Sequence, residues 1–257
     1  MRITDRKESP IIGLTGMGGG LASYILYGTA APKIGEAYGG GYFAGQLDDS
    51  GTIYNLVVAP AVSPRPGGGG NLEGQYGGST PGTIQWKTTN TGPDTTATSH
   101  LYGGTATVAN ANSSHPMFNW AVNNFGGPNA GTYDASNTTG TGIGGYNDWY
   151  IPARYELELL YRNFKPTTEA NTTGLGANPH AVPPTSNYTS GDPAQTTVAD
   201  FQAGGAEAFS TSIYYWNATE SIYQTQCWAQ WFDTGLWTNS ANKFESFHAR
   251  AVRRVAA

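Results

Sequence analysis

The sequence has 257 residues and a formal net charge of −5, and only 12% of its residues are charged, against about 25% in a typical globular protein. Lysine and arginine cluster only at Arg253-Arg254 and near the start of the chain. A nucleic-acid partner is therefore not expected, because it requires a concentrated basic face. The aromatic content of 12% argues against a disordered chain.

Residues 1–35 are predicted to form an arm that attaches the protein to a neighbouring subunit or a larger assembly. The first ten residues are polar and are not followed by the apolar segment of a signal peptide. No run of about 18 apolar residues occurs, so membrane insertion is not expected. Closely spaced glycines between positions 13 and 20 disfavour a helix. The alternative is a strand with a glycine bulge that closes the domain's own core. The proposed attachment residues are Ile11, Ile12, Leu14, Leu21 and Tyr24.

A β-hairpin is predicted where the domain begins. Residues 40–47 are rich in aromatic and small side chains, and residues 53–60 are rich in β-branched side chains and end at a proline. The turn-forming run Asp48-Asp49-Ser50-Gly51 separates them, which is typical of a hairpin.

Two main helices are predicted between long Gly/Pro-rich loops at residues 63–104 and 165–205. The first helix covers residues 117–125, whose apolar side chains recur at helical spacing. The second runs from about residue 153 to 163, between Pro152 and Pro166. A short strand is expected at 83–89, a short helix at 196–204, and a last sheet formed by strands at 208–216, 226–232 and 249–255.

No metal, cofactor or catalytic group is expected. The four histidines are scattered, without a His-x-x-x-His spacing. Glu156 and Glu158 are two residues apart, so on a helix they point in different directions and cannot act as a carboxylate pair. We expect Glu156 to bind backbone or an arginine near the helix start. The lone cysteine, Cys227, is expected to be buried on a core strand. The glycine pattern at 140–145 lacks the strand and helix that a nucleotide site requires.

Three motifs carry a resemblance to a known family. They are Gly-Tyr-Asn-Asp-Trp-Tyr-Ile-Pro-Ala-Arg-Tyr-Glu-Leu at 145–157, Tyr-Trp-Asn-Ala-Thr-Glu at 215–220, and Arg-Ala-Val-Arg at 250–253. In this order they resemble the C-type-lectin-like fold, in the branch shared by formylglycine-generating enzymes, bacterial surface domains and phage receptor-binding proteins. The resemblance covers roughly residues 36–257. It implies an α+β domain with small antiparallel sheets, two main helices and long loops, preceded by the arm.

The resemblance implies binding rather than catalysis. Formylglycine-generating enzymes use a pair of cysteines, and this chain has one. Calcium-dependent lectins of this fold use a Trp-Asn-Asp element, and here residues 216–218 read Trp-Asn-Ala, so calcium-dependent sugar binding is not expected. Residues 1–35 are similar to the attachment segment of phage tail and neck fibres. The expected protein is thus a non-enzymatic virion fibre, commonly a homotrimer, attached to other virion proteins through its arm.

The C-terminal region is where related phage proteins display their recognition surface. Aromatic and amide side chains crowd between residues 214 and 242, and such side chains suit saccharide or protein surfaces. The candidate residues for binding a host-surface glycan or protein are Tyr214, Tyr223, Gln226, Trp237, Asn239 and Asn242. Trp216, Trp228 and Phe232 are expected to be core residues. Strand 226–232 has a large aromatic on each face, so it is either covered on both sides or offers one face to a ligand.

Three alternatives remain open. The chain could be a purely structural collar or decoration protein of a virion, in which the fold only builds contacts. An enzyme of the formylglycine-generating type is disfavoured by the single cysteine. A secreted bacterial adhesin is disfavoured by the absence of a signal peptide.

Overall fold

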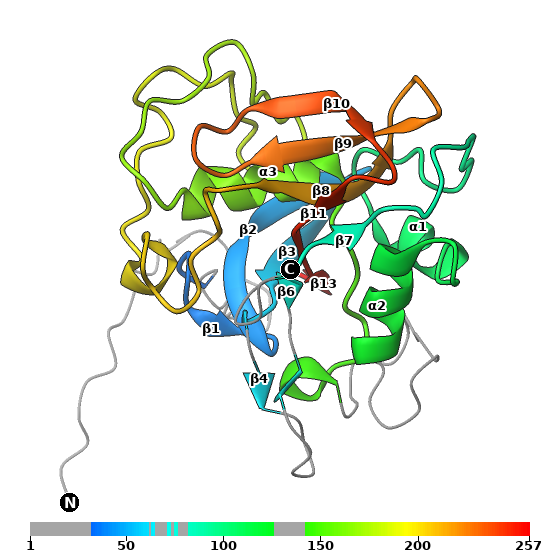
Figure 1. Cartoon of the computed structure of the whole chain (residues 1–257). Coiled ribbons are helices and arrows are strands. Elements are labelled where there is room, and N and C mark those ends of the chain that lie inside the picture. The colour runs from blue at the N-terminus through cyan, green and yellow to red at the C-terminus, as the bar shows by residue number, and fades with distance from the viewer. Residues whose placement is uncertain (1–31, 62, 65–70, 73–74, 77–81, 126–141) are drawn as a thin grey trace, which may run out of the picture. The chain divides into compact units, whose positions relative to one another are not determined.

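The computed structural model describes residues 32–61, 63–64, 71–72, 75–76, 82–125 and 142–257. Pro32–Ala257 form one compact unit, and its described residues contain three α-helices and antiparallel sheets, which confirms the α+β class (Figure 1). None of the described helices is long and apolar enough to cross a membrane. The predicted attachment residues, Ile11, Ile12, Leu14, Leu21 and Tyr24, lie outside the described residues.

The larger sheet has the strand order β1-β2-β3-β13. Its strands are β1 (Ala37–Tyr38), β2 (Gly41–Asp49), β3 (Thr52–Val58) and β13 (Val252–Ala256). The predicted hairpin is confirmed as β2 and β3, and the Gly51 amide donates to Asp48 Oδ1 in its turn at 2.6 Å. The prediction that residues 249–255 join the last sheet is wrong. Val252–Ala256 instead pair antiparallel with β3, whose last four residues, Asn55 to Val58, are all buried.

The second sheet has the order β10-β9-β8, with β8 at Tyr214–Glu220, β9 at Gln226–Trp231 and β10 at Trp237–Asn242. The predicted strand at 208–216 is too long, since β8 begins only at Tyr214, and β10 was not predicted. Helix α3 (Arg154–Phe164) contacts β2 of the first sheet and β8 and β9 of the second (Figure 1). It therefore lies between the two sheets.

Helix α3 begins where the sequence indicates. Its N-terminus is capped by Glu156, whose Oε2 accepts the Ala153 amide at 2.8 Å, which satisfies one of the free amides of a first helical turn. Leu157, Leu160 and Phe164 are buried on its apolar face. Helix α2 (Pro116–Phe125) is also confirmed. Helix α1 (Gly104–Ala109) was not predicted, since its small residues carry no strong helical pattern.

Short elements join the loops to the sheets. Three two-stranded ladders pair β4 (Ser63–Pro64) with β5 (Asn71–Leu72), β6 (Gln75–Tyr76) with β12 (Ala249–Arg250), and β7 (Ile84–Gln85) with β11 (Ser246–Phe247). The strand predicted at 83–89 is thus only two residues long, and the helix predicted at 196–204 is a single 3₁₀ turn at Ala199–Phe201. Beyond Gln85 the backbone bonds to separate loops rather than to one strand, since the Lys87 amide donates to the Lys243 carbonyl and the Thr88 amide to the Ser114 carbonyl.

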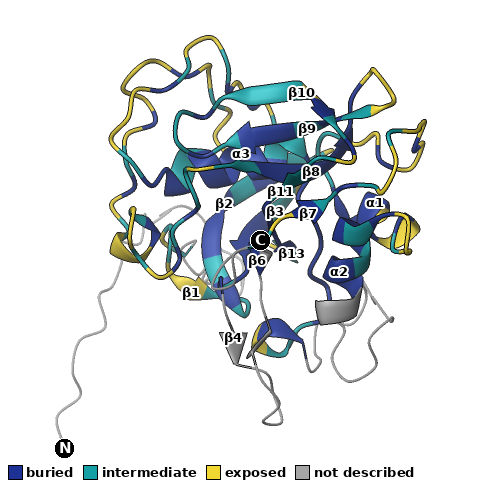
Figure 2. Cartoon of the chain, viewed as in Figure 1, coloured by how far each residue is buried: buried dark blue, intermediate teal, exposed yellow. Residues whose placement is uncertain are grey.

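Buried side chains form two apolar clusters, one on each face of the β8–β10 sheet. Trp216, Cys227 and Ala229 belong to the cluster that includes α2 and β7, whereas Tyr215 and Phe232 belong to the cluster that includes α3. The strands are mostly buried, and the exposed residues lie mainly in loops (Figure 2). Both faces of β9 are therefore covered along most of its length. Cys227 is fully buried, as predicted, and burial raises the pKa of its thiol well above its ordinary value.

Candidate functional site

The six residues predicted to bind a ligand do not form one cluster. Asn242 pairs with Gln226 at one end of β10, whereas Trp237 pairs with Gln230 at the other. Tyr214 packs its ring against those of Trp231 and Phe247, with centroids 5.4 and 5.3 Å apart. Asn239 lies in an irregular part of β10, between the paired residues 238 and 241. Only Tyr223, Gln226 and Asn242 come together, at the end of the sheet where β8 turns into β9.

This end of the sheet exposes large apolar side chains, and we call it the tip surface. Ile222 and Tyr223, in the loop between β8 and β9, are 80% and 58% exposed. Phe244, in the turn after β10, is 46% exposed. The two loops are neighbours, because the Lys243 amide donates to the Thr225 carbonyl at 3.4 Å. The loop between β8 and β9 projects from the end of the sheet and is largely exposed (Figure 2).

A third loop, residues 88–94, lies beside these two. The Asn90 side chain donates to Asn242 Oδ1 at 3.2 Å and accepts the Lys243 amide at 3.2 Å. Gly92 fits closely against the loop between β8 and β9, since a Cβ at this position would lie 1.9 Å from the Gln224 carbonyl oxygen. Glycine is therefore required for the close approach of these two loops.

A buried group of charges, the Lys243 cluster, ties the three loops together. Lys243 is fully buried, and its Nζ lies 2.5 Å from Asp94 Oδ2 and 2.6 Å from Glu220 Oε1. Asp94 also accepts hydrogen bonds from Lys87 at 2.8 Å and from His115 at 3.1 Å. The partners belong to different loops, so the cluster fixes these loops relative to one another.

Asp94, at the centre of the Lys243 cluster, is ionised at neutral pH. Burial alone would raise the pKa of Asp94, but the hydrogen bonds from His115, Lys243 and Lys87 outweigh it and hold the pKa well below its ordinary value. A buried carboxylate with several donors is stabilised in its charged form. The tip surface is thus carried by loops held by charged hydrogen bonds, which reduces the conformational entropy that a binding partner would have to remove.

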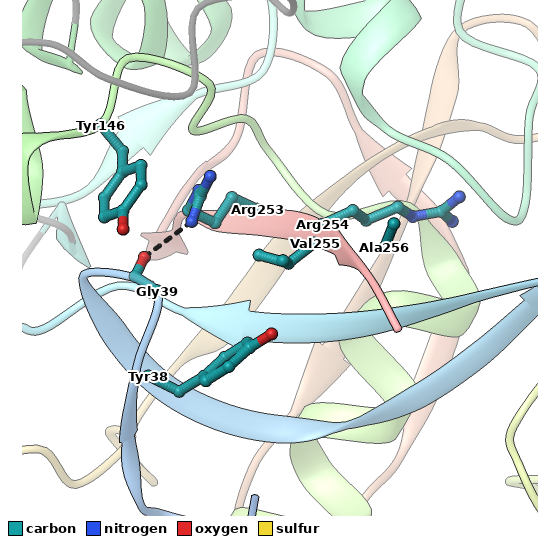
Figure 3. A pocket seen from close by; sticks show the side chains of 7 residues that line it. All are labelled: Tyr38, Gly39, Tyr146, Arg253, Arg254, Val255 and Ala256. Atoms are coloured by element: carbon teal, nitrogen blue, oxygen red, sulfur yellow. Dashed lines mark hydrogen bonds between the residues drawn. The ribbon is translucent and has the colours of Figure 1, made fainter. Parts of the chain in front are cut away.

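A cavity of about 380 Å³ opens at the end of the larger sheet. Figure 3 shows Tyr38 and Tyr146 on its walls and Arg253 donating to the Gly39 carbonyl, at 2.9 Å. Arg253 also binds the Asp148 carboxylate at 2.6 and 2.8 Å, and Arg254 binds Glu156 at 2.7 Å. Both guanidinium groups are already neutralised, so the cavity offers aromatic rings rather than free charge. None of its lining residues was predicted to bind a ligand.

Glu156 has the structural role predicted for it. Its Oε2 accepts the amides of Ala153 and Gly103 at 2.8 and 3.1 Å, and its Oε1 accepts Arg254 Nε at 2.7 Å. Within the described ranges, no group of three or more histidine, cysteine or acidic side chains is arranged to hold a metal ion.

Two tryptophans of the second sheet differ from each other in burial. Trp216 is fully buried and its Nε1 donates to the Ile84 carbonyl at 2.8 Å, and Phe232 is also fully buried, as predicted. The prediction that Trp228 is a core residue is wrong. It is partly exposed. Its ring contacts Arg154 in the first turn of α3, so Trp228 lies at the margin of the surface that this helix covers.

The chain matches no protein-family model, no curated protein and no solved structure.

Proposed function

We propose that this chain is a non-enzymatic fibre protein of a phage virion, in the tail or neck. Residues 1–35 attach it to other virion proteins, and a C-type-lectin-like domain recognises a host-surface glycan or protein through the tip surface. The domain acts as a homotrimer. One observation supports the proposed recognition most directly. Ile222, Tyr223 and Phe244 are exposed on neighbouring loops that the Lys243 cluster fixes.

Exposed apolar groups of this kind favour a binding role. A large apolar patch at the surface of a soluble protein commonly marks an interaction site. Tyrosine and amide side chains, here Tyr223, Gln226 and Asn242, adapt to polar partners at its margin. In the phage proteins that the motifs resemble, the recognition surface also lies in the C-terminal region, which here contains the tip surface.

Two further observations support a non-enzymatic protein with this fold. The Cys227 thiol is buried and its raised pKa keeps it protonated, which disfavours a thiolate nucleophile. The Trp-Asn-Ala-Thr-Glu motif locks the sheet. Asn217 Oδ1 accepts the Thr219 amide at 2.9 Å, the Thr219 hydroxyl donates to Ser99 at 2.7 Å, and Glu220 belongs to the Lys243 cluster.

The test is binding of the labelled full chain to intact cells of a panel of bacterial strains, measured by flow cytometry. The variant Ile222→Ser/Tyr223→Ser/Phe244→Ser removes the exposed apolar groups without touching the Lys243 cluster. We expect it to lose binding to any strain that the unmodified chain binds. The matched control is Val108→Ser, which removes an apolar side chain that is 48% exposed on α1, and it should bind normally.

Failure of the unmodified chain to bind any strain, or unchanged binding by the triple variant, would contradict recognition through the tip surface. The structural collar or decoration protein would then be the better account. Removal of residues 1–31, which leaves the compact unit Pro32–Ala257 intact, takes away most of the proposed arm and tests attachment. We expect the shortened chain to bind cells but no longer to assemble with virion proteins, and its mass in solution, measured by light scattering, tests the trimer.

A further inference from the structure

Arg154 differs from every other arginine that the structure describes. Of the five arginines in the described ranges, four have a carboxylate within 4.0 Å and Arg154 has none. The acid best placed to pair with it is Glu158, one turn further along α3, but Glu158 binds Arg162 at 3.0 Å and Asn178 at 2.7 Å. Glu158 therefore acts on Arg154 only at longer range, and no described carboxylate is in ion-pair contact with the Arg154 guanidinium.

Aromatic rings hold this guanidinium in place. Its central carbon lies 4.0 Å from the ring centroid of Trp228, 4.3 Å from that of Trp237 and 5.3 Å from that of Tyr155. Such cation–π contacts favour a positive charge over a ring face. All four side chains are partly exposed, so the group lies at the surface. We call it the Arg154 cluster.

One edge of the guanidinium is vacant. Nη1 lies 3.3 Å from His100 Nδ1, whereas Nε is buried without a hydrogen-bond partner and Nη2 has none among the described residues. Nε and Nη2 form the edge with which an arginine binds a carboxylate through two parallel hydrogen bonds. Nε is covered by the protein, so Nη2 is the group of this edge that a ligand contacts. The buried Trp228 Nε1 is a second donor without a partner.

His100 does not compete for an anion. Burial, together with the charge of Arg154, lowers the pKa of His100, so its ring is neutral and accepts the Nη1 hydrogen bond. Nor does the charge help the helix. Arg154 is the first residue of α3, where the helix dipole disfavours a cation. A cation at this end, with no described carboxylate in contact with it, is available to bind an anion.

From these observations we infer that the Arg154 cluster binds the carboxylate of an acidic sugar. The guanidinium donates to the carboxylate through Nη2, and the indole rings of Trp228 and Trp237 contact the apolar face of the pyranose. Gln226 lies on the same face of β9 as Trp228, two residues away, and joins the cluster to the tip surface. The inference thus deepens the proposed recognition of a host surface by naming a carboxylated glycan.

An acidic peptide is the less fitting ligand. A peptide carboxylate on a flexible side chain would use the arginine but would not require two indoles beside it. A pyranose has an apolar face that matches an aromatic ring, and amides such as that of Gln226 bind its hydroxyls.

The experiment measures binding of small ligands to the full chain by saturation-transfer NMR and by titration of tryptophan fluorescence. The matched pair is galacturonic acid and galactose, which differ in the carboxylate. N-Acetylneuraminic acid, inorganic phosphate and the peptide acetyl-Gly-Glu-Gly-amide complete the set. We expect galacturonic acid or N-acetylneuraminic acid to bind, and galactose to bind about tenfold more weakly or worse, since it cannot accept the charged hydrogen bond from Arg154.

Three variants assign the site. Arg154→Gln should reduce binding of the acidic sugar about tenfold or more, and Trp237→Ala should weaken it as well. Arg154→Lys keeps the charge and the length of the stem but loses the planar edge, so it should also bind poorly, and it replaces the glutamine variant if that one does not fold. Lys33→Gln removes an exposed positive charge elsewhere and should leave binding unchanged.

Each other outcome overturns the inference. No binding of either acidic sugar, equal binding of galactose, or full binding by Arg154→Lys excludes a carboxylate held at the guanidinium edge. Tighter binding of phosphate or of the peptide excludes a sugar as the ligand. The proposed function has a separate readout. If the triple tip variant loses cell binding but the unmodified chain binds no sugar, the proposed recognition through the tip surface stands and this inference is rejected. If the unmodified chain binds the acidic sugar but no cells, this inference stands and recognition through the tip surface is rejected.

Discussion

Lys243 Nζ lies 2.6 Å from Glu220 Oε1, and both side chains are buried. This contact joins the turn after β10 to the end of β8. Breaking a buried ion pair on one side leaves an uncompensated charge, which costs more than an exposed pair ever contributes. The tip surface therefore depends on a few residues beneath it that do not themselves reach solvent.

Lys243→Met should lower the free energy of unfolding by about 3–5 kcal/mol, because Glu220 and Asp94 lose a buried partner. Urea denaturation followed by tryptophan fluorescence measures the change. The control, Lys33→Met, removes an exposed lysine and should cost little. A loss of less than about 1 kcal/mol, the scale of an exposed pair, would show that the cluster is solvated.

Asp94 should make the protein sensitive to acid. Its pKa is depressed in the folded state and is about 3.9 in the unfolded chain, so the unfolded state binds more protons. The stabilisation is therefore fully present above about pH 4 and is lost as the pH falls below that value toward the folded-state pKa. In Asp94→Asn, denaturation midpoints between about pH 5 and pH 2.5 should vary less steeply with pH.

The control for Asp94 is Asp192→Asn. The Asp192 side chain is 71% exposed and lies 3.6 Å from Arg162, so its replacement should leave the slope of stability against pH unchanged. Equal slopes in Asp94→Asn and the unmodified chain would contradict the role of the Lys243 cluster in acid sensitivity.

Gly92→Ala should displace the loop between β8 and β9. The added Cβ would lie 1.9 Å from the Gln224 carbonyl oxygen and 2.9 Å from Glu220 Oε1, and overpacking of this kind costs about 1–3 kcal/mol. Thermal unfolding measures the loss. Gly191→Ala is the matched control, since a Cβ there meets nothing within 4 Å. A crystal structure of Gly92→Ala with an unmoved loop would contradict the expected displacement.

Glu156→Gln should destabilise the whole domain by about 3–5 kcal/mol. Glu156 is fully buried, and an amide cannot accept hydrogen bonds at both ends from Tyr150, Arg254 and two backbone amides. Urea denaturation measures the loss against Glu169→Gln, which replaces an exposed glutamate. Similar stability of the two variants would show that Glu156 does not hold α3 to β13.

Local signals explain what the sequence could predict. The turn at Asp48–Gly51 and the prolines at 152 and 166 set the limits of the hairpin and of α3, because their effects act within a few residues. The pairing of β13 with β3 joins residues about two hundred positions apart, and no local pattern specifies such a partner. The same reason explains why residues 249–255 were grouped with the wrong sheet.

The candidate site was predicted in part. Tyr223, one of the candidate binding residues, is exposed because it lies in a turn between two strands. Ile222 and Phe244 were not predicted, since an apolar side chain in a sequence normally indicates core. The contact between Trp228 and Arg154 was not predicted, because it depends on tertiary packing. Helix α3 begins at Arg154, and only the packing of this helix on the sheet shows which strand residues it leaves partly exposed.

The pairing of β13 with β3 also determines when the domain can complete its folding during synthesis. Arg250, Arg253 and Arg254 bind Glu207, Asp148 and Glu156, all of which the ribosome synthesises earlier. Until residues 250–256 emerge from the exit tunnel, these three carboxylates have no arginine partner and β3 has an unpaired edge. The domain must therefore complete its folding after synthesis of β13, and a nascent chain stalled before that strand would expose an edge that favours aggregation.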